Sequence, residues 1–207
     1  MAMYVYEETT NILFKEHFEK SAVDYRRFWQ EICAKYPGWT ADFVYRNAEP
    51  PMEFIKEIGA RLLEALRITI LTGETFSYSD KTDATPVNAE NFHIFARLHK
   101  NIDPEFAHPN ERIAGNLDRW RIFMKGSAYV MMSYWSKEPE IFALVAKDAH
   151  EGALLLAAAA KYAFADGLKK LDFYVDVDAP MEMEAAAKIG FTETGKSIAY
   201  RVDSIGS

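Results

Sequence analysis

The sequence contains one cysteine, Cys33, in 207 residues, and it has no long apolar run. A single cysteine can form neither an intrachain disulfide nor a cysteine metal cluster, so we expect a reducing compartment, with the cytoplasm as the default location. The longest apolar run, 152–160, ends at Lys161, whereas a helix needs roughly 18–20 apolar residues to span a bilayer. The first residues also lack the basic and then apolar segments of a signal peptide. The sequence therefore predicts neither membrane insertion nor secretion.

Basic residues are scarce and dispersed. The chain has 24 Lys and Arg against 31 Asp and Glu, a net charge of −7, and no basic run is longer than two residues. Proteins that coat nucleic acids bind phosphates through clustered Lys and Arg, so we expect no nucleic-acid partner. The acidic balance favours a cationic partner instead.

Several familiar catalytic and metal-binding spacings are missing. No histidine lies in an HExxH pattern or at ligand spacing from the cysteine, so we predict no metal site. No GxSxG is present, which argues against the nucleophile elbow of a serine hydrolase. The histidines are His17, His93, His99, His108 and His150.

The composition is that of a folded globular protein. Hydrophobic residues make up 49% of the chain and aromatic residues 14%, with 10 Gly and 8 Pro, which excludes a low-complexity or disordered chain. The length suits one large domain or two small ones. We predict two parts, an N-terminal α/β extension over 1–71 and a larger domain over 72–207, because the polar, turn-rich stretch 72–91 separates them.

Apolar spacing predicts a helix–strand–helix–strand order in the N-terminal extension. Aromatic and apolar residues recur at helical offsets from Asn11 to about Tyr36, and Pro37 and Gly38 would end that helix. A short strand is expected over 41–45. A second helix would begin at Pro51 and lead into a strand over 67–71. The residues that define the two apolar helix faces are Phe14, Phe18, Tyr25, Phe28, Trp29, Ile32, Phe54, Ile55, Ile58, Leu62, Leu63 and Leu66.

The C-terminal domain is richer in strands, and its predicted fold class is α/β, more narrowly α+β. Two short helices precede three sequential strands, which make an antiparallel meander. An apolar, alanine-rich helix and then an alternating strand follow, and Pro180 starts a last helix before the final strand. The expected helices are 88–99, 109–118, 152–166 and 180–189, and the expected strands are 120–125, 128–135, 140–145, 171–177 and 197–202.

Four features in this order resemble a known family. They are the hairpin ending in Tyr134 and Trp135, the strand 140–145 that runs into a loop and helix, the 15-residue spacing from Gly152 to Gly167, and the Lys-Ile-Gly-Phe of 188–191. Residues 76–204 resemble the GNAT superfamily of acyl-CoA-dependent N-acetyltransferases. The resemblance implies a mixed, mostly antiparallel central sheet flanked by helices, with acetyl-CoA as cosubstrate and no metal.

The loop before the alanine-rich helix matches the family's cofactor motif in part. That motif, Gln/Arg-x-x-Gly-x-Gly/Ala, holds the cofactor diphosphate on backbone amides at a helix N-terminus. Here Lys147 takes the first position, His150 replaces the middle glycine and Gly152 matches the last, and the loop is about two residues shorter than usual. Lys147 and His150 would supply cations to phosphate. The residues implied to bind acetyl-CoA are Leu144, Val145, Lys147, His150, Glu151, Gly152 and Ala153.

The family's catalytic residues are matched less well. Its asparagine and its general-acid tyrosine align with Ala179 and Ala186, which cannot do that chemistry. A strand carboxylate acts as base in other members, acting through water on the amine, and Glu140 stands at that position. Strand alternation predicts Glu140 on one face with Phe142 and Leu144; the alternative is a solvent-exposed charge after Pro139. Tyr174 and Tyr200 are the remaining candidate proton donors.

Three functions are consistent with these patterns. The first is an N-acetyltransferase that passes acetyl directly from acetyl-CoA to a small-molecule or peptide amine. The second is a CoA-binding or regulatory module with reduced catalysis, and the third is an interaction domain without a cofactor. The extension 1–71 is either a truncated second copy, because Asp42-Phe43 and Ile58-Gly59 echo Asp172-Phe173 and Ile189-Gly190, or a helical cover for the sheet or acceptor cleft. Homodimerisation is left open.

Overall fold

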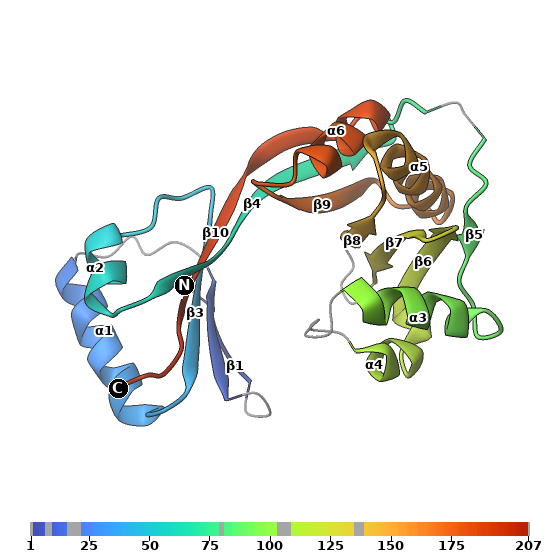
Figure 1. Ribbon diagram of the computed structural model, residues 1–207. Helices are drawn as coiled ribbons and strands as arrows, with labels where there is room; N and C mark the ends of the chain where they lie inside the picture. Colours follow the sequence, from blue (N-terminus) through green and yellow to red (C-terminus); the bar gives the residue numbers. More distant parts are fainter. Residues whose placement is uncertain are drawn as a thin grey trace. The chain divides into compact units, whose positions relative to one another are not determined.

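The computed structural model describes residues 2–6, 10–15, 22–78, 81–102, 109–134 and 139–206 (Figure 1). The chain divides into two compact units. Unit 1 comprises Met1–Arg67 and Gly195–Ser207, and unit 2 comprises Ile68–Thr194. Two strands, β4 (Arg61–Thr72) and β10 (Thr192–Val202), contribute residues to both units. The C-terminal segment therefore completes the N-terminal unit.

Unit 1 consists of strands with two helices packed against them. The strand order is β1 (Ala2–Tyr6), β2 (Asn11–Lys15), β3 (Thr40–Arg46), β10 and β4. β2 and β3 are parallel, whereas β1/β2 and β3/β10 are antiparallel. The helices are α1 (Ala22–Lys35) and α2 (Met52–Glu57), and side chains from both helices share one core with β2 and β3.

Two helix predictions in unit 1 were wrong at their ends. Asn11–Lys15 forms a strand, and the helix begins at Ala22. Phe14 lies buried, stacked on Phe43 of β3 at 4.8 Å between ring centroids and edge-on to Phe28 of α1 at 5.3 Å, so it packs from its strand against a neighbouring strand and a helix. The second helix ends at Glu57, because Gly59 adopts a left-handed φ of +66°, and Leu62, Leu63 and Leu66 belong to β4. Phe18 lies outside the described residues.

Unit 2 is built on a mixed, mostly antiparallel sheet, as predicted. β5 (Thr85–Pro86), β6 (Trp120–Lys125), β7 (Ala128–Ser133) and β8 (Glu140–Val145) pair antiparallel in sequence order, so the predicted meander is confirmed. β9 (Lys170–Asp176) pairs parallel with β8. The helix between these two strands makes the crossover that a parallel pair requires. Trp135 of the predicted hairpin lies outside the described residues.

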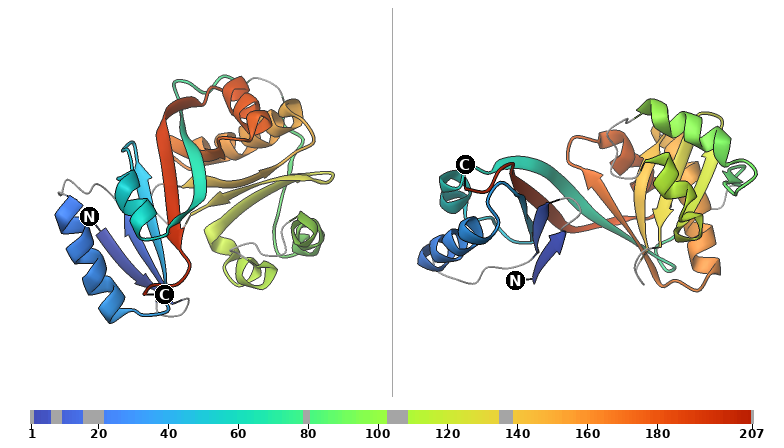
Figure 2. Two further views of the ribbon diagram at one scale, coloured as in Figure 1. Left: turned by 60° about the vertical axis from the view of Figure 1, so that its left-hand side comes forward. Right: turned by 90° about the horizontal axis from the view of Figure 1, so that it is seen from below.

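Helices cover both faces of this sheet. α5 (Ala149–Ala165) and α6 (Pro180–Ile189) share a core with Val130, Met132 and Phe173. α3 (Phe92–Ile102) and α4 (Asn110–Ala114) pack on the alternate residues, including Tyr129 and Met131. Figure 2 shows the yellow strands between the green helices and the orange helix α5. Because β7 is covered on both sides, all six of its residues are buried. A 3₁₀ turn, Leu117–Arg119, precedes β6.

α5 and α6 lie side by side in unit 2, and small residues make this possible (Figure 1). Four consecutive alanines, 157–160, are buried in α5, and Ala185 and Ala186 are buried in α6. Gly167 at φ +87° follows the end of α5, and Gly190 at φ +102° follows the end of α6, as expected from the sequence. Within the described residues, no helix is both long and apolar enough to cross a membrane.

Candidate functional site

The parallel pair β8 and β9 separates soon after it begins. Its ladder consists of two residue pairs, Glu140 with Asp172 and Ile141 with Phe173. Within the described stretch 139–206, no further pair joins the two strands, although β8 continues to Val145. The hydroxyl of Thr69 on β4 donates to the carbonyl of Phe173 at 2.8 Å, so β9 is held from its other side. The strands thus part toward the N-terminus of α5.

A β-bulge in β8 changes which residues share a face. Ile141 and Ala143 pair with the consecutive residues Met132 and Met131, so Phe142 is inserted between them. Leu144 therefore joins Ile141 in the core beneath α5, whereas Phe142 packs in the core beneath α3. The prediction of one face for Glu140, Phe142 and Leu144 was wrong, because simple alternation breaks at the bulge.

Glu140 lies at the start of the ladder beside a second carboxylate. It is half-buried, and its register partner on β9 is Asp172, whose side chain is 13% exposed. The Oδ2 atom of Asp172 lies 3.5 Å from Nζ of Lys170, and its Oδ1 atom is buried without a hydrogen-bond partner among the described residues. Two adjacent carboxylates on neighbouring strands thus lie at this end of the strand pair, with Lys170 as a neighbouring cation.

The N-terminus of α5 is capped by the chain's own carboxylates. Asp148 is the N-cap residue, and its Oδ1 accepts a hydrogen bond from the backbone N–H of Glu151 at 2.8 Å. Glu151 in turn accepts one from the backbone N–H of Lys147 at 3.0 Å. This reciprocal arrangement is a form of the capping box. The hydrogen bond from the Glu151 N–H, with the nearby cationic Lys147, lowers the pKa of the Asp148 carboxyl.

The structure brings the predicted loop residues together but gives them different surroundings. Lys147 and His150 are exposed, and Nζ of Lys147 lies 3.9 Å from Oε1 of Glu151. The side chain of Glu151 is only 14% exposed. Val145 is half-buried beside the core under α3.

Three of the predicted binding residues have no exposed side chain. Leu144 and Ala153 are buried, and so is Gly152. A Cβ atom at Gly152 would lie 2.9 Å from the Cβ of Ala185 and 3.4 Å from Cδ2 of Leu144. This glycine therefore permits the close approach of α6 to α5. A side chain at this position would point into the core.

The residues after β9 include a carboxylate that the sequence reasoning missed. Ala186, at the family's tyrosine position, is buried, and Ala179 is the N-cap of α6 without a side-chain cap. One turn before Ala186, on the same side of the helix, lies Glu182. Burial and then the charge of Asp176 raise the pKa of the Glu182 carboxyl. The i, i+4 spacing of Glu182 and Ala186 is visible in the sequence, but its burial is not.

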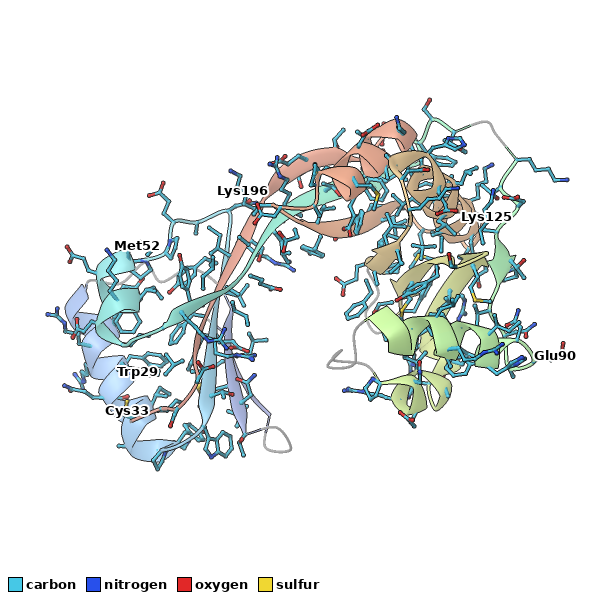
Figure 3. The ribbon with its side chains drawn as sticks, in the orientation of Figure 1. Trp29, Cys33, Met52, Glu90, Lys125 and Lys196 are labelled. Atoms are coloured by element: carbon cyan, nitrogen blue, oxygen red, sulfur yellow. The ribbon has the colours of Figure 1, made fainter. Side chains whose placement is uncertain are left out.

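The candidate proton donors lie in different units. Tyr174 is half-buried on β9 in unit 2. Tyr200 belongs to unit 1, where its hydroxyl donates to Sδ of Met52 at 3.4 Å. Figure 3 labels Met52 on α2, together with Trp29 and Cys33 on α1. Tyr200 is thus engaged within unit 1, whereas Tyr174 belongs to the same strand pair as Glu140.

Two hollows lie away from the strands that part. One, of about 450 Å³, lies in unit 2. It is lined by residues 72–74, by Phe164 in the last turn of α5, and by Leu168 and Lys169 after that helix. The other, of about 390 Å³, lies in unit 1 and is lined by Trp29, Cys33 and Asp203 among others. In the part of the chain that the structure describes, no group of three His, Cys, Asp or Glu residues could hold a metal ion.

The comparisons with known proteins rest on structure. No protein-family model matches the chain, and no curated protein matches it in sequence. A GCN5-related N-acetyltransferase from Sphaerobacter thermophilus has a TM-score of 0.72 at 8% identity, over 99% of this chain and 76% of that one. A GNAT-family acetyltransferase from Colwellia psychrerythraea has a TM-score of 0.62 at 12% identity, over 96% and 80%.

A third structure is similar to the same extent. It is a functionally unknown conserved protein from Staphylococcus epidermidis, with a TM-score of 0.65 at 12% identity over 94% of this chain and 85% of that one. At such identities the likeness concerns the fold. Together with the parted strands β8 and β9, it shows that this chain has the fold of the GNAT superfamily of N-acetyltransferases.

Proposed function

We propose that unit 2 transfers an acetyl group from acetyl-CoA directly to an amine. The observation that carries the proposal is the two-pair ladder between β8 and β9. Strands that part inside a sheet leave main-chain N–H and C=O groups without ladder partners, and such groups must find other partners. An extended pantetheine arm, with its amides and its thioester carbonyl, supplies them.

The base in this proposal is Glu140. Glu140 lies at one end of β8, and the loop at 146–148 follows the other end. An acetyl-CoA molecule lying along the strand would extend from the loop toward Glu140 over about 16 Å, at 3.3 Å per residue. A carboxylate at this point can take a proton from the attacking amine, directly or through one water. The ammonium first gives one proton to Glu140, which passes it on to solvent. The amine nitrogen then forms the new bond to the acyl carbon, the C–S bond breaks, and a second proton from the nitrogen goes to the departing thiolate, so that CoA leaves as the thiol.

The neighbouring Asp172 supports an amine as acceptor. Amines arrive as ammonium ions near neutral pH, and the two carboxylates Glu140 and Asp172 outnumber the one lysine paired with Asp172, Lys170, so they attract such ions. The overall charge of −7 favours the same class of acceptor. The single half-buried thiol, Cys33, supports a reducing compartment such as the cytoplasm.

The test is release of CoA thiol with a panel of small amines and of peptides with free amino groups. We expect turnover by the wild-type chain and a fall in kcat of roughly 10²- to 10⁴-fold in Glu140→Gln. The matched control is Glu184→Gln, an exposed carboxylate of α6 that pairs with Lys188, and it should leave kcat unchanged. Equal turnover by Glu140→Gln would remove Glu140 as the base. Binding of acetyl-CoA without turnover on any amine would identify a binding module in place of an enzyme.

A further inference from the structure

Carboxylates of the chain itself hold two backbone amides at the start of α5. The backbone N–H of Lys147 donates to Glu151 and that of Glu151 donates to Asp148, while the N–H of Gly152 makes the first intrahelical hydrogen bond, to the Asp148 carbonyl at 3.0 Å. A diphosphate bound at this helix end would compete for the N–H groups of Lys147 and Glu151. It would have to displace at least one carboxylate before it could form any of these hydrogen bonds.

The charges at this helix end also disfavour a diphosphate. Asp148 and Glu151 place two carboxylates beside one lysine, Lys147. The pKa of Asp148 is lowered, first by the hydrogen bond from Glu151 N–H, so this carboxylate is ionised at neutral pH. A doubly charged ligand next to two carboxylates meets repulsion at short range, where screening by salt is weak.

Gly152 offers no alternative approach for the ligand. Its open side faces Ala185, at 2.9 Å from an added Cβ, so the glycine that matches the family motif is used for packing between helices. The residues present therefore do not fit the diphosphate of CoA, whereas the parted strands fit its pantetheine arm.

From this disagreement we propose that Asp148 determines donor specificity: by placing a negative charge beside the Glu151 N–H that it caps, it makes unit 2 recognise the acyl-pantetheine part of a donor and reject its diphosphate. This proposal rests on the proposed function for the identity of the donor. It differs from that function in one consequence, namely that a thioester lacking the nucleotide half of CoA is bound as well as acetyl-CoA.

The test removes the negative charge of Asp148 and keeps its N-cap hydrogen bond. Asn serves as an N-cap as well as Asp does, so Asp148→Asn retains the acceptor for Glu151 N–H and removes one negative charge. Asp166→Asn, at the other end of α5, makes the same change in net charge and is the matched control. Binding of acetyl-CoA, S-acetylpantetheine and inorganic diphosphate is measured by calorimetry on the full chain.

We expect the wild-type chain to bind acetyl-CoA and S-acetylpantetheine within about threefold of each other and to bind no diphosphate at millimolar concentration. Asp148→Asn should bind acetyl-CoA at least about tenfold more tightly, should gain diphosphate binding, and should leave S-acetylpantetheine unchanged; a tenfold gain corresponds to about 1.4 kcal/mol. Asp166→Asn should match the wild type throughout.

Other results would overturn the inference. Diphosphate that competes with acetyl-CoA in the wild-type chain, or an Asp148→Asn variant without a gain for acetyl-CoA and diphosphate, would show that Asp148 does not control this helix end. If neither thioester binds to any variant while Asp148→Asn still gains diphosphate, the role of Asp148 stands and the proposed function fails.

Discussion

Gly152 of α5 faces Ala185 of α6 so closely that a side chain on Gly152 would not fit without a shift. A Cβ atom added to Gly152 would lie 2.9 Å from the Cβ of Ala185, nearer than two such atoms can sit. The approach sets how α6 packs on α5, next to the loop that begins at the end of β8. A residue that the family motif assigns to the cofactor thus has a packing role in this chain.

We predict that Gly152→Ala lowers the stability of unit 2. Alanine favours a helix interior over glycine by about 1 kcal/mol, but overpacking of a close contact costs about 1–3 kcal/mol, so the clash prevails. The midpoint of thermal unfolding should fall by about 2–6 °C. The swapped variant, Gly152→Ala with Ala185→Gly, restores the space and should unfold within about 1 °C of wild type. Equal melting of wild type and Gly152→Ala would mean that the helices adjust freely.

A second prediction compares the glycines after the two helices. Both have left-handed φ values, +87° at Gly167 and +102° at Gly190. A Cβ at Gly167 would meet no atom within 4 Å, whereas one at Gly190 would lie 1.9 Å from the backbone oxygen of Thr75. Gly167→Ala should therefore cost about 1–2 kcal/mol from backbone strain alone, and Gly190→Ala more than about 3 kcal/mol. Urea titration of both variants measures the difference, and equal losses would contradict it.

The sequence predicted unit 2 better than unit 1, for local reasons. Pro180 and Gly190 bracket α6, and Gly126 separates β6 from β7, so the residues that begin and end these elements are visible in the chain. In unit 1, by contrast, the aromatic Phe14 fits both a helical spacing and a strand. Its burial against Phe43 decides the outcome, and that contact joins distant parts of the sequence.

At the candidate site the sequence also contains a helix-capping signal, which the family motif does not take into account. The pair Asp148 and Glu151, three residues apart at a helix start, is a capping signal that can be recognised without a structure. Alignment to the motif assigned the same stretch to a ligand. The bulge at Phe142 and the burial of Glu182 could not be predicted, because both depend on tertiary packing; the bulge arises where β8 pairs with β7.

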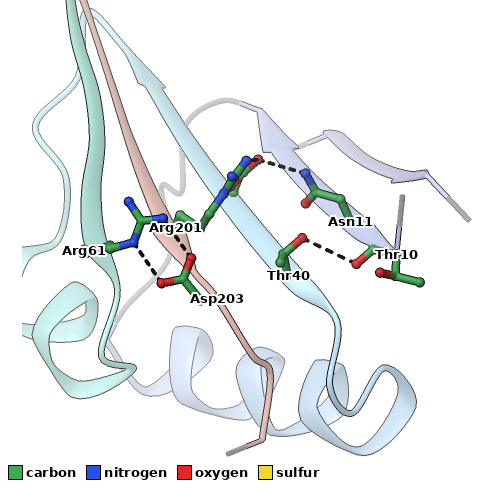
Figure 4. A network of polar contacts seen from close by, with 7 residues as sticks. Thr10, Asn11, Thr40, Arg61, Arg201 and Asp203 are labelled. Carbon is green, nitrogen blue, oxygen red and sulfur yellow. Dashed lines mark hydrogen bonds and ion pairs between the residues drawn. The ribbon is translucent and has the colours of Figure 1, made fainter. Parts of the chain in front are cut away.

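A third prediction concerns the polar network of unit 1. Arg201 donates to both carboxylate oxygens of Asp42, at 2.8 Å from its terminal nitrogen to Oδ2, and Asn11 donates to Oδ2 at 2.9 Å (Figure 4). Asp42 is buried, so removing it leaves a half-buried guanidinium without its counter-charge. Asp42→Ala should cost about 2–4 kcal/mol, whereas Asp203→Ala, which breaks an exposed pair with Arg61, should change the melting temperature little.

A double variant separates the charge pair from the packing around it. Asp42→Ala combined with Arg201→Met removes both charges, so it should lose less stability than the two single variants together. Additive losses would show that the two side chains contribute independently and that their bidentate contact has little energetic value.

The last prediction follows from the carboxyl of Glu182. Burial, with the charge of Asp176, raises its pKa above the ordinary value of 4.5, so the folded state disfavours the ionised form. Above the folded pKa, the ionised carboxylate destabilises the folded state relative to the unfolded chain; below 4.5 the group is protonated in both states and the penalty is gone. Glu182→Gln should therefore raise the melting temperature at pH 7 by about 1–2 °C, and the gain should disappear near pH 4.

Glu184→Gln, on the exposed side of α6 and paired with Lys188 at 2.9 Å, is the matched control and should show no gain at either pH. A gain for Glu182→Gln that persists unchanged at pH 4 would mean that shape, and not charge, disfavours glutamate at this position.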